Sequence, residues 1–222
     1  MVQFPSTQWS LIRRSGETPS ARREAFGKLA RTYRGAILAF FRARLSSDAA
    51  EDATQAFLAA SFEHGWWSRA DADRGSFRSF LLLLLRRHLG HLRDLHQLPV
   101  APLDSLPELA DLGALAERQF DSRFALLLTG RALDALRGQY IARGRASLFE
   151  QLLPLLSSPP EHGQTKLLAI ALGMPANTLT VEIARLRKRL RESLRAELMQ
   201  LCADQTMFEA EWTTLQQVLD GA

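Results

Sequence analysis

Residues 165–195 read TKLLAIALGMPANTLTVEIARLRKRLRESLR, and this stretch decides our prediction of the fold. It predicts a short helix over 165–172, a turn at residues 173–175 (Gly-Met-Pro) and a long helix over about 177–203. A short helix, a glycine-containing turn and a longer helix are typical of a helix-turn-helix. We therefore expect a DNA-binding motif in this part of the chain.

The long helix of this motif is predicted to have a core face and a reading face. Leu179, Ile183, Leu186 and Leu190 recur at helical spacing, so we expect them to face the core. Polar and basic side chains on the other face and at the N-terminal tip suit contacts with phosphates and base edges. The candidate DNA-binding residues are Asn177, Thr178, Thr180, Val181, Glu182, Ala184, Arg185, Lys188 and Arg189.

Two points about this helix stay open at the level of sequence. The Glu182 carboxylate can accept a hydrogen bond from cytosine, or it can pair with Arg185 or Lys188. A solvated amphipathic helix without a nucleic-acid ligand is the alternative interpretation, because arginine-rich outer faces are common.

The rest of the chain is also predicted to be helical, which makes the fold all-α. Ala, Leu, Arg and Glu dominate, and no alternating strand pattern is present. Ser20, Asp48 (with Glu51 completing a capping box) and Ser76 are the expected N-caps of three helices, and Gly35 is a candidate break in the first. The helices are expected at 20–45, 48–63, 76–95, 122–144, 146–155 and 206–219. Five consecutive leucines at 81–85 predict that the third helix is buried on several sides.

The predicted organisation is two small helical domains joined by a linker. Three prolines and several carboxylates between residues 98 and 121 predict an acidic interdomain linker, with a short helix near 112–120. We therefore divide the chain into a first domain at 1–97, the linker at 98–121, the helix-turn-helix domain at 122–203 and a C-terminal amphipathic helix at 204–222.

Composition bears on the cellular compartment that we expect for this protein. The formal net charge is only +4, and Cys202 is the single cysteine, so no disulfide framework is expected. The first ten residues do not resemble a signal peptide, and the longest apolar run, 80–85, is far shorter than the roughly 20 residues of a membrane span. We expect a cytoplasmic protein without membrane insertion.

Several segments, in order along the chain, resemble extracytoplasmic-function sigma factors of the sigma-70 family. Residues 48–57 (DAAEDATQAF), 69–71 (RAD) and 75–81 (GSFRSFL) resemble the family's first conserved domain. Residues 4–11 (FPSTQWSL) resemble the opening of a subgroup known from planctomycetes and their relatives. Residues 131–136 (RALDAL), 149–150 (FE), 172–174 (LGM) and 179–189 (LTVEIARLRKR) are similar to the second domain of that subgroup.

The resemblance implies a transcription initiation factor without catalysis or cofactor of its own, whose partners are core RNA polymerase and promoter DNA. The 165–195 motif would then read the minus-thirty-five element. The polymerase-binding residues implied are Glu51, Asp52 and Gln55. The residues implied for the melted minus-ten element, where aromatic rings stack on bases and arginines bind phosphates, are Trp66, Trp67, Arg74, Phe77, Arg78, Arg86 and Arg87. For Trp66 and Trp67 the alternative interpretation is a loop anchor in the core. For Phe77 and Phe80 it is packing, with Arg78 the more exposed of the three, and for Glu51 and Asp52 it is a solvated helix face.

Three other functions stay open. A helix-turn-helix regulator would bind DNA without polymerase, and a degenerate sigma-like protein would serve as an interaction module. A small hydrolase would use His88, His91 and carboxylate groups. No Cys, Asp or Glu joins these histidines at the spacing of metal ligands, so no metal is predicted.

The C-terminal helix is predicted to bury Phe208, Trp212, Leu215 and Leu219 against its own domain. A second hypothesis is regulatory: its carboxylates Asp204, Glu209, Glu211 and Asp220 would cover the basic recognition helix. An anti-sigma factor or another regulatory partner is left open by the resemblance.

Overall fold

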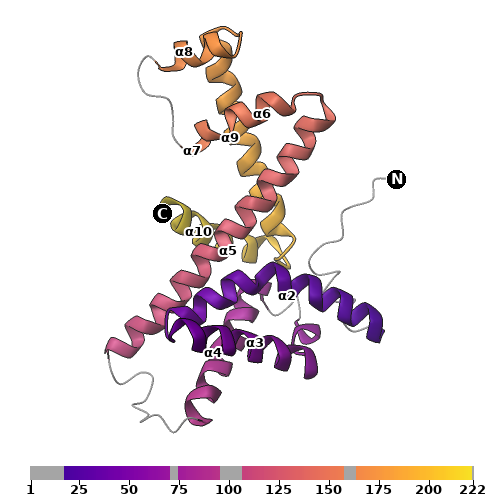
Figure 1. Ribbon diagram of the computed structural model, residues 1–222, viewed down its shortest axis with the longest axis vertical. Helices are drawn as coiled ribbons and strands as arrows, with labels where there is room; N and C mark the ends of the chain where they lie inside the picture. The colour runs from indigo at the N-terminus through magenta and orange to yellow at the C-terminus, as the bar shows by residue number, and fades with distance from the viewer. Residues whose placement is uncertain (1–17, 71–74, 96–106, 158–163, 222) are drawn as a thin grey trace. The chain divides into compact units, whose positions relative to one another are not determined.

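The computed structural model describes residues 18–70, 75–95, 107–157 and 164–221, and every regular element within these ranges is helical (Figure 1). The all-α prediction is therefore confirmed. The elements are α2 (Pro19–Arg42), α3 (Ser47–Glu63), the 3-10 turn η1 (Trp67–Arg69), α4 (Phe77–Leu95), α5 (Pro107–Ala142), α6 (Ala146–Leu152), α7 (Pro154–Ser157), α8 (Gln164–Ala171), α9 (Ala176–Met199) and α10 (Gln205–Asp220). The motif at residues 4–11 lies outside the described residues.

The chain separates into two compact units. The first unit contains the described residues through Leu127 and those from Leu198 onward, and the second unit is Leu128–Glu197. This grouping differs from the expected division in its boundaries, because α5 and α9 each carry residues of both units. It also assigns α10 to the first unit, whereas the sequence led us to expect it on the helix-turn-helix domain.

The segment expected to be a linker is helical from Pro107 onward. Residues 107–142 form one helix, α5, and not a short helix followed by a second one from residue 122. Proline disrupts a helix only in its interior, since at the first helical position its missing N–H has no partner to lose. The linker prediction is therefore wrong for 107–121, while residues 98–106 lie outside the described ranges.

Two predicted helix starts give contrasting results. The predicted cap of α4 is confirmed, because the Ser76 hydroxyl accepts the backbone N–H of Ser79 at 3.0 Å. The predicted cap of α2 is wrong: Thr18 caps that helix, two residues before Ser20, and Pro19 follows at the first helical position. Gly35 does not interrupt α2.

The core of the first unit is built mainly from aromatic and leucine side chains. Helices α2 and α3 lie side by side (Figure 1), and α4, α5 and α10 contribute further buried residues. In α4 the leucine run is buried along one side only, because Leu83 is exposed. The most buried side chains are Leu29, Tyr33, Ile37, Phe41, Phe57, Trp67, Phe77, Leu81, Leu85, Phe120 and Phe208.

The core of the second unit confirms the predicted inner face of the long helix. Leu179, Ile183 and Leu186 are buried, and Leu190 packs partly buried against them. They pack with the side chains Leu136, Tyr140, Phe149, Leu152, Leu155 and Ala169 from α5 to α8. The single helix expected over 146–155 is divided into α6 and α7 at Pro154, whose nitrogen cannot donate a hydrogen bond.

Candidate nucleic-acid interface

Helices α8 and α9 meet across a sharp turn in the second unit. Their directions differ by 95°, and Gly173 in the turn has φ 62°, a left-handed conformation that glycine adopts readily. The backbone N–H of Met174 donates to the carbonyl oxygen of Ala169 at 2.9 Å and closes the end of α8. No single helix in the described part of the chain is long and apolar enough to span a membrane; this bent pair passes that test only jointly, by length and composition.

The first three turns of α9 present a continuous exposed face. Residues 177, 181, 184 and 188 recur at helical spacing, and all four are exposed, with the Lys188 side chain 79% accessible. Thr178, Thr180 and Arg185 are exposed beside them. Most of the predicted reading residues therefore lie on one exposed face of α9.

Glu182 does not belong to this exposed face. Its side chain is buried, and the carboxylate pairs with Arg185 at 3.1 Å and with Arg145 at 3.5 Å. Of the roles considered above, the structure contains the pairing with Arg185, whereas Lys188 pairs with Glu192 instead, at 3.9 Å. Reading a cytosine would require the Glu182 carboxylate to give up both arginine partners.

Two basic residues of α9 contact other residues of the second unit. The Arg189 guanidinium lies 5.7 Å from the centre of the Tyr140 ring, and Arg187 donates to the carbonyl oxygen of Leu155 at 3.0 Å. The exposed cations of the basic run are therefore Arg185, Arg187, Lys188 and Arg191, while Arg189 is partly buried.

The positive charge of the chain is concentrated in the second unit. Residues 128–197 contain 11 Lys and Arg against 6 Asp and Glu, a net charge of +5, while the remainder of the sequence carries −1. The whole chain therefore has only a mild excess of positive charge, whereas the second unit has a marked one. Such a local excess favours an anionic partner for the second unit.

In the first unit, two of the predicted base-stacking rings are in the core. Trp67 is 1% exposed with its ring 4.8 Å from that of Phe26, and Phe77 is fully buried with its ring 5.0 Å from that of Tyr33. The loop-anchor interpretation therefore holds for Trp67. Trp66 is only partly buried, and its ring stacks on His64 at 5.7 Å.

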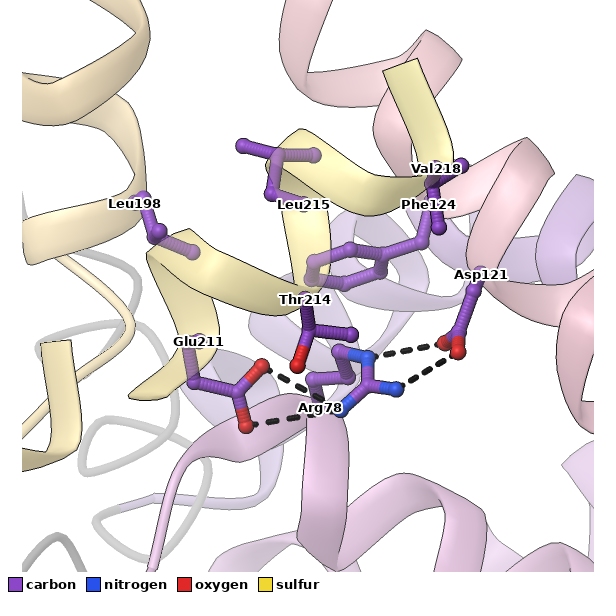
Figure 2. Close-up of a pocket in the computed structure, with 8 residues that line it drawn as sticks. All are labelled: Arg78, Asp121, Phe124, Leu198, Glu211, Thr214, Leu215 and Val218. Atoms are coloured by element: carbon purple, nitrogen blue, oxygen red, sulfur yellow. Dashed lines mark hydrogen bonds and ion pairs between the residues drawn. The ribbon is translucent and has the colours of Figure 1, made fainter. Parts of the chain in front are cut away.

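Arg78 lies in a buried ion cluster (Figure 2), together with carboxylates from α5 and α10. Its guanidinium contacts Asp121 through two hydrogen bonds of 2.8 and 2.7 Å, and Glu211 at 3.2 Å. The three side chains are 15%, 13% and 8% exposed. The hydroxyls of Ser76 and Ser79 also donate to Glu211, so one carboxylate collects three donors from the start of α4.

The cluster holds two carboxylates for one guanidinium. Burial opposes the charge of Arg78, but hydrogen bonds and charges from Asp121 and Glu211 outweigh it and raise the pKa of Arg78. Burial also raises the pKa of Asp121; Arg78 lowers it by less than burial and the neighbouring carboxylates raise it. The charged form of Asp121 is therefore held at a cost that Arg78 does not fully offset.

The other arginines predicted for the minus-ten element differ in their surroundings. Arg86 pairs with Glu117 at 2.6 Å in a half-exposed position. Glu117 lies on α5, four residues before Asp121. Thus one face of α5, in the stretch expected to be a linker, pairs with two arginines of α4. Arg87 is exposed, and Arg74 lies outside the described residues.

The predicted polymerase face on α3 is mostly solvent-facing. Asp52 and Gln55 are exposed, while Glu51 pairs with Arg34 at 2.6 Å and Arg42 at 3.4 Å on α2. The predicted capping box is wrong: Ser46 is the N-cap position of α3, Asp48 lies in the first turn, and Glu51 is turned toward α2.

His88, considered above for a hydrolase, lies in an aromatic enclosure. It is 8% exposed, and its ring centre lies 5.5 Å from that of Phe57, 6.0 Å from that of Phe41 and 6.3 Å from that of Trp66. Its Nε2 makes no hydrogen bond with the described residues, and His91 is exposed. Within the described ranges, no three His, Cys, Asp or Glu side chains are grouped as a metal site requires.

This enclosure predicts a loss of stability in acid. Burial, together with the charge of His91, lowers the pKa of His88 below its usual 6.5, so the unfolded chain binds the proton more tightly than the folded one. The free energy of unfolding should therefore fall as the pH drops below about 6.5, by at most about 1.4 kcal/mol per pH unit. Urea unfolding between pH 5 and 8 measures this.

The test variant is His88→Phe, in which the free energy of unfolding should depend less steeply on pH. The control variant is His91→Gln, which should largely retain the pH dependence of the parent. An unchanged slope in His88→Phe would show that another group is responsible.

Comparison of the chain with protein-family models, with curated proteins and with solved structures gives no match.

Proposed function

We propose that the second unit is a helix-turn-helix domain that binds duplex DNA through the N-terminal face of α9. The observation that carries this proposal is the bend of 95° across four residues between α8 and α9, within the roughly 90–120° range of this motif. The exposed face of α9 and the local charge of +5 supply the polar and basic groups that a major groove requires.

Within this class we propose the more specific role of an extracytoplasmic-function sigma factor, which acts in the cytoplasm with core RNA polymerase at promoters. The support is the ordered set of segments at 48–57, 75–81 and 179–189 that resemble this family. The exposed Asp52 and Gln55 on α3 provide an accessible polar surface for the polymerase.

A sigma-like interaction module is the second candidate, and one observation favours it. Trp67, Phe77 and Arg78, which the resemblance assigns to the melted minus-ten element, are buried or ion-paired. A protein of this kind would bind polymerase or another partner without opening a promoter.

Core polymerase binding followed by transcription separates the candidates. The purified full chain is mixed with core RNA polymerase, and the complex is tested for run-off transcription on a promoter library. Transcripts with a shared upstream motif support the sigma factor, and polymerase binding without transcription supports the interaction module. Duplex binding without any polymerase complex would instead favour a regulator that acts alone.

The reading surface predicts a charge-specific loss of DNA affinity. Lys188→Gln removes an exposed cation of α9, so duplex DNA should bind more weakly, and the slope of log affinity against log salt should decrease by about one. Fluorescence anisotropy at several salt concentrations measures both. Lys28→Gln, an equal change at an exposed position on α2, is the control and should leave the slope unchanged. Equal effects of the two variants would mean that α9 is not the DNA surface.

A further inference from the structure

We propose that α10 is a displaceable cover over the start of α4, and that Glu211 occupies donors of α4 that otherwise bind a phosphate of single-stranded DNA. This inference rests on the proposed function, because it concerns regulation of the minus-ten surface. Of the carboxylates considered for covering α9, Glu211 contacts α4.

The first support is the set of donors that Glu211 receives. Arg78 donates through its guanidinium (Figure 2), and Ser76 and Ser79 donate through their hydroxyls. The Glu211 carboxylate therefore lies within an array of three donors. Hydroxyls and guanidinium groups are among the side-chain donors that bind phosphates. The same array therefore suits a phosphodiester once the carboxylate has left.

The second support is how α10 is held in place. Phe208, Trp212 and Leu215 are buried, and the N–H of Phe77 donates to the carbonyl oxygen of Leu201 at 3.2 Å, just before α10. The described contacts of α10 thus include an apolar contact and the Glu211 carboxylate. Displacing α10 would release the Glu211 partners on α4 together.

The third support is the uneven charge of the cluster. Asp121 remains beside Arg78 when Glu211 leaves, so the guanidinium keeps one carboxylate and loses the second. A single-stranded backbone would then replace the lost anion, and the exposed Arg87 lies farther along α4 to meet the strand elsewhere.

The first experiment measures the affinity of the full chain for a single-stranded oligonucleotide. Glu211→Gln keeps the shape of the side chain but removes its charge, so affinity should rise about tenfold, the scale of one hydrogen bond to a charged group. Asp220→Asn, an equal charge change at an exposed position of α10, is the matched control and should leave affinity unchanged. Equal affinities of Glu211→Gln and Asp220→Asn overturn the proposal.

The second experiment needs no variant, so it does not depend on the folding of Glu211→Gln. Cys202, the only cysteine, is buried beside α10, and burial with the charges of Glu211 and Asp204 raises its pKa to about 12. A thiol reagent should therefore label the closed protein slowly. Single-stranded oligonucleotide should accelerate labelling severalfold, whereas a duplex of equal length should not.

The outcomes separate this inference from the proposed function. An oligonucleotide that binds without accelerating labelling overturns the cover, as does the absence of single-strand binding in both wild type and Glu211→Gln. A chain that joins core polymerase and transcribes while these results are negative keeps the proposed function and loses the cover. A chain that never joins core polymerase loses the proposed function, whatever the labelling shows.

Discussion

Replacing Arg78 with methionine should lower the free energy of unfolding of the first unit by about 3–5 kcal/mol, because it leaves two buried carboxylates without their cation. The methionine fills much the same volume, so the loss is mainly electrostatic. Urea unfolding followed by tryptophan fluorescence reports on this unit, since Trp66, Trp67 and Trp212 all belong to it.

Arg86→Met is the matched control for this prediction. It makes the same change on the same helix, opposite the same partner helix, but the Arg86–Glu117 pair is half exposed and should contribute less than about 1 kcal/mol. Similar losses in the two variants would show that burial of the Arg78 cluster has no energetic consequence.

A triple variant tests the reason for the loss. Replacing Arg78, Asp121 and Glu211 together with methionine or leucine removes the charges along with their partner. Stability should return to that of the parent or exceed it, since buried ion clusters contribute little net stability compared with apolar side chains of similar volume. If the triple variant stays as unstable as Arg78→Met, the loss is one of packing and not of charge.

The second large effect on stability is expected at Trp67, and its neighbour Trp66, which is less buried, serves for comparison. Trp67→Ala should lower the free energy of unfolding by about 3–5 kcal/mol, because the whole side chain is enclosed by Phe26 and Phe77. Trp66→Ala should cost clearly less, since its ring is partly accessible. Denaturant unfolding of the two variants gives the comparison.

The same pair separates packing from base recognition. If the proposed function is correct, Trp66→Ala should weaken single-strand binding by about 1–3 kcal/mol, the usual contribution of one stacked base. Trp67→Phe, which keeps an aromatic ring in the core, should retain binding. The opposite pattern, with binding lost only in the Trp67 variant, would contradict the assignment of Trp67 to the core.

Local patterns predicted local structure well and long-range partners poorly. The apolar period at Leu179, Ile183 and Leu186 was enough to define the inner face of α9, because helical spacing alone determines which residues share a side. The prediction of a linker was wrong for residues 107–121, because the prolines up to residue 107 were interpreted as helix breaks. Pro107 instead starts α5, and the carboxylates that made the stretch look like a linker pair with arginines of α4.

The partners of Arg78 were also beyond what local sequence patterns predict. A basic residue in a segment that resembles a nucleic-acid surface was expected to face solvent, but Arg78 meets Asp121, 43 positions away, and Glu211, 133 positions away. No periodicity within one segment carries this information. The sequence did single out both carboxylates as features of acidic segments, without a means of joining them to Arg78.

The order of the chain has a consequence for synthesis. The second unit is inserted into the sequence of the first, so about 70 residues separate Leu127 from the remainder of the first unit. At roughly 5–20 residues per second, a ribosome needs about 4–14 s to make that insertion. During this interval Arg78 has Asp121 but not Glu211, and the apolar surface that later receives Phe208 and Trp212 is open. The nascent chain therefore passes through a stage in which the start of α4 is uncovered, and α10, made after the insertion, completes the first unit.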